Sequence, residues 1–165
     1  MPAQPRSRNS GPAAAPRNRA AILASARRLF AEQGYRVPLN AIAKAAGVGQ
    51  GVLYRHFPNR LTLAFEVFAD NFAELERVAA ETDGPESFHS LWHLVVDYTV
   101  RSVAFVEMVI EARAKVPESL GARRLEHLIA EPLARAQQAG LADPAWTPND
   151  VLLLQRMMYL SLIHI

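Results

Sequence analysis

The chain has 165 residues, of which 50% are hydrophobic and 21% are charged, and it contains no cysteine. This composition supplies enough apolar side chains for one or two small globular units. The lack of cysteine excludes disulfides, thiol nucleophiles and cysteine zinc ligands, and it suits a reducing compartment, so we expect a cytoplasmic protein. No stretch reaches the roughly 18 apolar residues of a membrane span, and residues 1–16 lack the apolar segment of a secretory signal.

Charge is distributed unevenly along the chain. Residues 1–60 hold ten Arg or Lys and one acid, Glu32, for a net charge of +9. Residues 61–165 hold eight Arg or Lys and fifteen acids, for a net charge of −7. This asymmetry indicates that only the first part would meet a polyanion such as nucleic acid. A solvated charge run with a loose basic tail accounts for the same numbers, so charge alone leaves the partner open.

The chain is expected to begin with an arm and a helix. Residues 1–16 hold four prolines and few large apolar side chains, which predicts a flexible basic arm. Such an arm either follows phosphates or a minor groove, or is an inert leader. A helix then starts with Asn18 as its N-cap and ends at Gly34, because glycine adopts the positive φ of a helix end at little cost. Its buried stripe comprises Ile22, Ala26, Leu29 and Phe30.

Two short helices follow and complete a domain over residues 17–60. The first opens at Pro38-Leu39 and stops at Gly47-Val48-Gly49, and the second covers 50–57 before Pro58. The residues expected to face inward are Leu39, Ile42, Ala43, Ala46, Leu53 and Phe57. Two short helices joined by a tight glycine turn match a helix-turn-helix.

The rest of the chain is predicted to be a second helical domain over residues 61–165, so the fold class is all-α. One amphipathic helix should run unbroken from Arg60 to about Ala80 and link the two domains. Three helices should cover about 86–102, 103–116 and 120–139, with Pro132 kinking or splitting the third. A final helix should begin after Thr147, with Thr147 as N-cap, Pro148 in the first position and Asp150 completing the start signal.

The leading end of the second short helix carries the candidate base contacts. A helix in a major groove about 12 Å wide needs small or hydrogen-bonding groups at this end. Gln50 can pair with adenine or reach a phosphate, and Arg55 can reach guanine or a phosphate. Val52 can touch only a thymine methyl, and Gly51 lets the backbone approach DNA closely. The glycines can equally be turn residues with no binding role.

Three further residues are candidate phosphate contacts. Tyr54 and His56 are amphipathic side chains suited to phosphates. Arg60 opens a helix, where the helix dipole disfavours a cation, so a phosphate contact explains it better than stabilisation does. The alternatives are a core tyrosine and a surface histidine.

Residues 22–60 resemble the DNA-binding domain of the tetracycline-repressor (TetR) family. The resemblance rests on Ile22-Leu23, Ala26, Leu29-Phe30, Gly34-Tyr35, Ile42-Ala43, Ala46-Gly47-Val48, Gly51, Leu53-Tyr54, His56-Phe57 and Arg60. It implies a homodimeric all-helical regulator, usually a repressor released by a small molecule, that binds double-stranded DNA at a palindromic operator. It also implies that Tyr54, His56 and the cation at position 60 touch phosphates, with residues 50–52 and Arg55 nearest the bases. Gly49, Val52 and Pro38-Leu39 depart from the family's usual residues, and these departures concern individual phosphate contacts rather than the fold.

The second domain offers weaker signals. Large side chains on its helices are candidate ligand contacts, and core packing is the alternative for each of them: Trp92, Phe105, Met108, Met157 and Tyr159. His89 and His93 are spaced to share a metal ion on one helix face, and Glu86 is one choice for a third ligand. The alternative is that both histidines simply face solvent. We therefore expect no metal and no cofactor.

The interpretation of the whole chain is a DNA-binding transcriptional regulator rather than an enzyme, since we find no catalytic triad order, phosphate loop or spaced carboxylates. The rivals are a protein of the same fold without an effector, and a helical metal protein or enzyme built on His89 and His93. Ligand binding would tilt the linking helix and change the separation of two recognition helices. Residues 151–165 are so apolar that either a partner subunit covers them or the chain is incomplete at this end.

Overall fold

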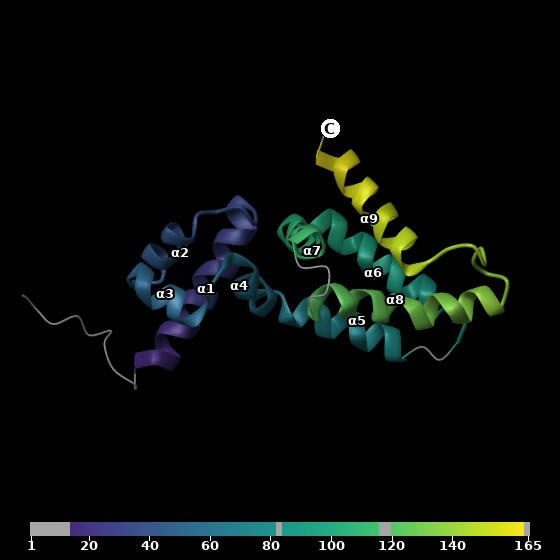
Figure 1. Ribbon diagram of the computed structural model, residues 1–165, viewed down its shortest axis with the longest axis horizontal. Helices are drawn as coiled ribbons and strands as arrows, with labels where there is room; N and C mark the ends of the chain where they lie inside the picture. The colour runs from purple at the N-terminus through teal and green to yellow at the C-terminus, as the bar shows by residue number, and fades with distance from the viewer. Residues whose placement is uncertain (1–13, 82–83, 116–119, 164–165) are drawn as a thin grey trace, which may run out of the picture. The chain divides into compact units, whose positions relative to one another are not determined.

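The computed structural model describes residues 14–81, 84–115 and 120–163, and within these ranges all regular structure is helical, as predicted (Figure 1). The expected arm lies almost entirely outside the described residues. The described part contains no helix both long enough and apolar enough to cross a membrane. The helices are α1 (Ala15–Gln33), α2 (Leu39–Ala45), α3 (Gln50–His56), α4 (Arg60–Val67), α5 (Ala69–Glu81), α6 (Ser87–Arg101), α7 (Val103–Lys115), α8 (Leu120–Gln138) and α9 (Pro148–Ile163).

The chain divides into two compact units between Val67 and Phe68, whereas sequence analysis placed the boundary after residue 60. Helix α4 belongs to the first unit because it packs on α1. We call the part up to Val67 the N-terminal unit and the part from Phe68 the C-terminal unit.

Helix α1 organises the N-terminal unit, since it contacts α2, α3 and α4. It begins at Ala15 with Pro16 in the first turn, so Asn18 lies inside the helix and is buried; its prediction as N-cap is wrong. Proline in the first turn needs no hydrogen-bond partner, which lets the helix start earlier than the polar residue suggested. The end at Gly34 is confirmed, with φ of 81° and its N–H donating to the Phe30 carbonyl at 3.1 Å.

The core of the N-terminal unit follows the predicted apolar stripes. The fully or nearly fully buried side chains are Ile22, Ala26, Leu29, Phe30, Tyr35, Val37, Ile42, Ala43, Leu53, Phe57, Leu63, Ala64 and Val67. Leu39 and Ala46, also predicted to face inward, are only half-buried. Each large apolar side chain buried in this way contributes about 1.5–3 kcal/mol, so the short helices are held by packing rather than by their own propensity.

The linking helix predicted from Arg60 to Ala80 is not continuous. Helix α4 ends at Val67, Phe68 forms a turn, and α5 begins at Ala69. Two adjacent apolar residues serve different cores here: Val67 is buried in the N-terminal unit, and the Phe68 ring lies 5.5 Å from that of Phe105 in the C-terminal unit. The Val67 carbonyl accepts a long hydrogen bond from Arg27 Nη2, at 3.5 Å. Amphipathic periodicity continues through such a break, so the sequence pattern does not reveal it.

The C-terminal unit is arranged around α6, which contacts α5, α7, α8 and α9. Beside it, the Phe105 ring lies within 5.3–5.5 Å of the rings of Phe68, Phe72 and Tyr98, all in edge-on orientations. Aromatic pairs in this geometry gain energy beyond the area they bury. The cluster joins the start of this unit to α6 and α7.

Helix α8 runs as one helix through Pro132, so of the kink or split that was expected there, the split does not occur. A proline inside a helix removes one backbone hydrogen bond and costs about 3 kcal/mol. Pro132 and the neighbouring Leu133 and Ala136 are buried, and α8 packs on α6. Burial of this apolar face offsets the cost of the proline.

Helix α9 starts as predicted, with Thr147 and Asp150 capping each other around Pro148. The Asp150 carboxylate accepts hydrogen bonds from the Thr147 N–H at 2.8 Å and the Thr147 hydroxyl at 2.6 Å, and the Asp150 N–H donates to the Thr147 hydroxyl at 3.3 Å. These bonds from Thr147 lower the pKa of the Asp150 carboxyl below its usual 3.8. The cap therefore depends on an ionised Asp150.

Acidification should weaken this cap. Because the folded-state pKa of Asp150 is lowered, its contribution is fully present above pH 3.8 and is lost as the pH falls through the lower folded value. We expect Asp150→Asn to reduce the thermal unfolding midpoint at neutral pH and to flatten its dependence between about pH 5 and pH 2. Asp143→Asn, in the loop before α9, is the matched control. An unaltered pH profile in Asp150→Asn would contradict the role assigned to the cap.

Candidate nucleic-acid interface

The turn between α2 and α3 sets the position of α3. Gly47 has φ of 67°, and the Val48 N–H donates to the Ala43 carbonyl at 3.0 Å. No side chain caps the first turn of α3, where Gly49 occupies the N-cap position. Leu53 and Phe57, each 1% exposed, anchor the other side of α3 in the core. The turn and these two anchors together hold α3 with one face in solvent.

That solvent face contains four of the predicted DNA contacts. Gln50, Gly51, Tyr54 and Arg55 are all exposed, and their spacing places them on one side of α3. Tyr54 is 49% exposed, which excludes the alternative of a core tyrosine. The Arg55 Nε donates to the Gly51 carbonyl at 3.2 Å, so this side chain lies along the helix surface.

Val52 and His56 are half-buried, so they flank the exposed face of α3 rather than forming it. A Cβ added to Gly49 or Gly51 would meet nothing within 4 Å. Packing within the chain therefore does not require glycine at either position. Because neither glycine has a side chain, another molecule can come close to the backbone at the start of α3.

The electrostatics of the N-terminal unit favour an anion. Residues 14–67 contain eight Arg or Lys and two acids, Glu32 and Glu66. Both acids are paired within the unit: Glu32 with Arg28 at 3.1 Å on α1, and Glu66 with Arg19. The remaining cations therefore set the surface charge.

Lys44 is an exposed cation that sequence analysis missed. It lies in the last turn of α2, next to the turn that leads into α3. Within the described residues, neither Lys44 nor Arg55 has an ion-pair partner. The signal for Lys44 was that it is the one charged residue of this short helix, although the helix dipole also favours a cation in a last turn.

Arg60 is bound within the protein, a role that the sequence did not indicate. Its Nη1 donates to the Tyr35 carbonyl at 2.6 Å and also to the Val37 carbonyl, and the guanidinium lies 5.5 Å from the centre of the Tyr35 ring. These contacts tie the start of α4 to the segment between α1 and α2. They supply a structural reason for a cation at a helix start. The other guanidinium N–H groups can still reach a phosphate.

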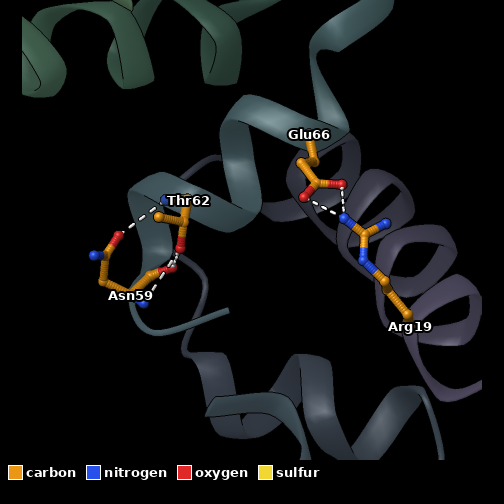
Figure 2. A network of polar contacts seen from close by, with 4 residues as sticks. All are labelled: Arg19, Asn59, Thr62 and Glu66. Carbon is orange, nitrogen blue, oxygen red and sulfur yellow. Dashed lines mark hydrogen bonds and ion pairs between the residues drawn. The ribbon is translucent and has the colours of Figure 1, made fainter. Parts of the chain in front are cut away.

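Figure 2 shows the polar contacts that cap α4 and pair it with α1. The Asn59 Oδ1 accepts a hydrogen bond from the Thr62 N–H at 2.9 Å, and the Thr62 hydroxyl bonds the Asn59 carbonyl at 2.8 Å, so Asn59 caps α4. Glu66, one turn further along, faces Arg19 of α1. The Arg19 guanidinium also lies 5.3 Å from the centre of the Phe57 ring. Arg19 thus joins α1 to the end of α3 and to α4.

The predicted ligand contacts in the C-terminal unit do not converge on one cavity. A cavity of about 30 Å³ lies among α5, α6, α7, α8 and α9, and its lining is almost entirely apolar. Of the five candidates only Phe105 lines it. Met108 and Tyr159 are buried elsewhere, Trp92 lines a separate groove, and Met157 is 58% exposed on α9. Helical spacing in the sequence shows which residues share one face of a helix. It does not show which faces of different helices enclose a cavity.

One polar pair lies beside this cavity. The Gln155 Nε2 of α9 donates to the Thr99 hydroxyl of α6 at 3.2 Å, and this hydroxyl donates to the Val95 carbonyl at 2.8 Å. Both side chains are buried, and Gln155 lines the cavity. The sequence offered no signal for Gln155, because it lies in the predominantly apolar segment 151–165.

Known proteins similar to this chain are regulators. A family model described as "Bacterial regulatory proteins, tetR family" matches residues 22–67. The HTH-type transcriptional regulator SAB2452 of Staphylococcus aureus is 45% identical over 51 residues, which are 30% of this chain and 28% of that protein. The regulator SACOL2593, from another strain of that species, is 30% identical over 92 residues, which are 51% of this chain and 46% of that protein. Residues 22–67 thus match the TetR family.

Solved structures extend the similarity over most of this chain. The structure of RolR in complex with resorcinol matches with a TM-score of 0.58 and 25% identity, over 84% of this chain and 73% of RolR. A TetR transcription regulatory protein from Mycobacterium vanbaalenii matches with a TM-score of 0.52 and 27% identity, over 92% of this chain and 94% of that chain. By contrast, this chain covers less than half of the length of each of the two curated relatives. The helical order of both units is therefore similar to that of these solved structures.

The contacts of Arg60 predict a loss of stability on its replacement. Arg60→Ala removes a charged donor from two backbone carbonyls, which should lower the free energy of unfolding by about 1.5–3 kcal/mol. Arg55→Ala is the matched control, because Arg55 is exposed and bonds only the Gly51 carbonyl; its effect should stay within about 0.5 kcal/mol. Denaturant unfolding measures both variants. Equal stability of Arg60→Ala and the unaltered protein would show that these contacts do not support α4.

Proposed function

We propose that this protein is a TetR-family transcriptional regulator that binds double-stranded DNA sequence-specifically and inserts α3 into a major groove. The observation that supports this most strongly is the exposed face of α3, which carries four polar or small residues. The two described acids of the same unit are already paired with arginines, so they do not oppose an approaching polyanion. Members of this family are generally DNA-binding regulators rather than enzymes.

Individual contacts follow from position and chemistry. Gln50, Gly51 and Val52 lie at the leading end of α3, where a helix entering the groove is nearest the bases, and Arg55 lies one turn later on the exposed face. Tyr54 and His56 would contact phosphates, and Arg60 would do so with the donors it does not use internally. Lys44 is added here as a phosphate contact because it is exposed and has no ion-pair partner among the described residues.

We further propose that the protein binds as a homodimer to a palindromic operator. Helix α9 buries Val151, Leu152, Gln155 and Tyr159 and exposes another apolar stripe, formed by Leu153, Met157 and Leu160. An exposed stripe of this kind is covered in most stable proteins, and a second copy of the chain would cover it. Two recognition helices in a dimer must lie about 34–36 Å apart, or a multiple of that distance, to reach successive grooves.

Release by a small molecule is the proposed mode of regulation, with a constitutive DNA-binding protein of the same fold as the second candidate. The C-terminal unit has an apolar cavity with one polar wall residue, but its volume of about 30 Å³ corresponds to roughly two water molecules. A ligand of resorcinol size, like the one bound to RolR, would therefore have to separate the helices around Phe105 and Gln155. To act as a switch, it would need about 5.5 kcal/mol of differential binding between two states.

Selection of bound duplexes from a random pool tests the DNA-binding proposal. Recovery of a palindromic sequence by the full chain would support sequence specificity and two-fold binding together. Enrichment of single half-sites would leave DNA binding in place and contradict the dimer. No enrichment and no retention at low salt, from folded protein, would overturn the proposed function.

Substitutions on α3 and α2 should separate base contacts from phosphate contacts. Gln50→Ala should change the preference among base pairs at one operator position by about 1–3 kcal/mol, because a base contact discriminates between sequences. Lys44→Ala should weaken binding to all DNA sequences by the same factor, because a phosphate contact does not depend on the bases. It should also reduce the slope of log affinity against log salt concentration by about one, because one phosphate contact is lost. Fluorescence anisotropy on matched and mismatched duplexes measures both effects.

Two exposed residues of α1 provide controls for these variants. Gln33→Ala matches Gln50→Ala at the far end of α1, and Arg28→Ala removes a cation that is already paired with Glu32. Both should leave base preference unchanged. An unchanged preference in Gln50→Ala would remove Gln50 from the base contacts.

A further inference from the structure

His89 and His93 are brought together on α6 in a way that the sequence spacing did not require. Their Nε2 atoms lie 3.1 Å apart, and the ring centres are separated by 4.4 Å with an angle of 78° between the planes. Both side chains are exposed. The same two nitrogens therefore point toward each other at the protein surface, rather than away into solvent.

This distance fits shared coordination of one metal ion. Histidine nitrogens bind zinc at about 2.0–2.1 Å, and two such bonds to nitrogens 3.1 Å apart enclose an angle of about 98°. That angle lies between the right angle of square-planar coordination and the tetrahedral angle. In the metal-free protein, one ring can instead donate a hydrogen bond to the other, and the metal ion would take the place of that proton.

We propose that His89 and His93 form a two-histidine surface site for a divalent transition metal ion, contrary to the expectation from sequence alone. Imidazole suits Cu²⁺, Ni²⁺ and Zn²⁺, and affinities of nitrogen sites generally peak at Cu²⁺. Mg²⁺ and Ca²⁺ prefer oxygen ligands and should not bind here. The site is independent of DNA binding and of the effector proposed above.

The protein supplies two ligands to this site, and water supplies the others. Within the part of the chain that the structure describes, no three histidine, cysteine or acidic residues are grouped closely enough to hold one ion. Glu86, the third ligand considered from sequence, lines a groove with His89 but does not complete such a group. The site is accordingly open, and its affinity should be lower than that of a three- or four-ligand site.

Metal binding at this pair would stabilise α6. The two ligands are one helical turn apart, so the ion binds them together only while that turn is formed. A ligand that binds the native state but not the unfolded state raises stability by mass action. Because α6 contacts all four other helices of the C-terminal unit, this local effect should appear in the unfolding of that unit.

Trp92 provides an optical reporter for the site. It lies three residues after His89 on α6 and lines the same groove. The other tryptophan, Trp146, lies in the loop before α9, so Trp146→Phe leaves Trp92 as the sole tryptophan of the chain. Cu²⁺ bound at the histidine pair should quench the Trp92 fluorescence.

The experiment titrates the full chain carrying Trp146→Phe with Cu²⁺ alone, with Mg²⁺ as the metal control. We expect saturable quenching with one Cu²⁺ per chain, a thermal unfolding midpoint that rises with Cu²⁺ concentration, and no response to Mg²⁺. His89→Ala and His93→Ala should each weaken binding by about tenfold or more, since each removes one of two nitrogen ligands. His127→Ala, an exposed histidine on α8, is the matched control and should bind like the parent.

Circular dichroism confirms that each variant is folded, and His89→Gln and His93→Gln provide second variants that keep a polar side chain of similar size. The proposal is overturned if Cu²⁺ gives no saturable quenching. It is also overturned if folded variants of His89 or His93 bind as tightly as the parent, or if His127→Ala loses binding to the same extent as they do.

Discussion

The burial of Leu53 and Phe57 in the core around α1 is the constraint on which the proposed interface depends. Helix α3 has seven residues, too few to be stable as an isolated helix in water. Its position is therefore set by the two apolar side chains on its inner face and by the glycine turn before it. When Leu53 and Phe57 are buried, helical geometry places Gln50, Gly51, Tyr54 and Arg55 on the outer face.

The polar contacts within the N-terminal unit also affect its surface charge. Arg19 engages Glu66, Arg28 engages Glu32, and Arg60 engages backbone carbonyls between α1 and α2. The described acids of this unit are thereby neutralised locally. Surface ion pairs add little stability, so their larger effect is to leave exposed cations such as Lys44 and Arg55 unopposed near α3.

The C-terminal unit combines a well-filled core with an exposed apolar face. The aromatic cluster around Phe105 and the buried pair of Thr99 and Gln155 connect α6 to its neighbours. The apolar cavity among the five helices measures about 30 Å³, and a groove of about 250 Å³ lies between α7 and α9. Helix α9 is apolar on both sides, and one helix can bury only one side against its own unit. The small volume of the apolar cavity supports the proposal that a ligand enters by movement of helices, and the exposed apolar face of α9 supports the proposed assembly with a second copy of the chain.

Periodicity and end signals in the sequence were sufficient for the helical class, the buried stripe of α1, the glycine turn, the Thr147–Asp150 start of α9 and the exposed residues of α3. These features are local: they depend on residues within a few positions of one another. The sequence could not reveal the break at Phe68, the continuity of α8 through Pro132, the internal contacts of Arg60 or the residues that line the cavity. Each of these depends on side-chain rotamers or on which distant helix packs against a given face, and only the tertiary structure decides those.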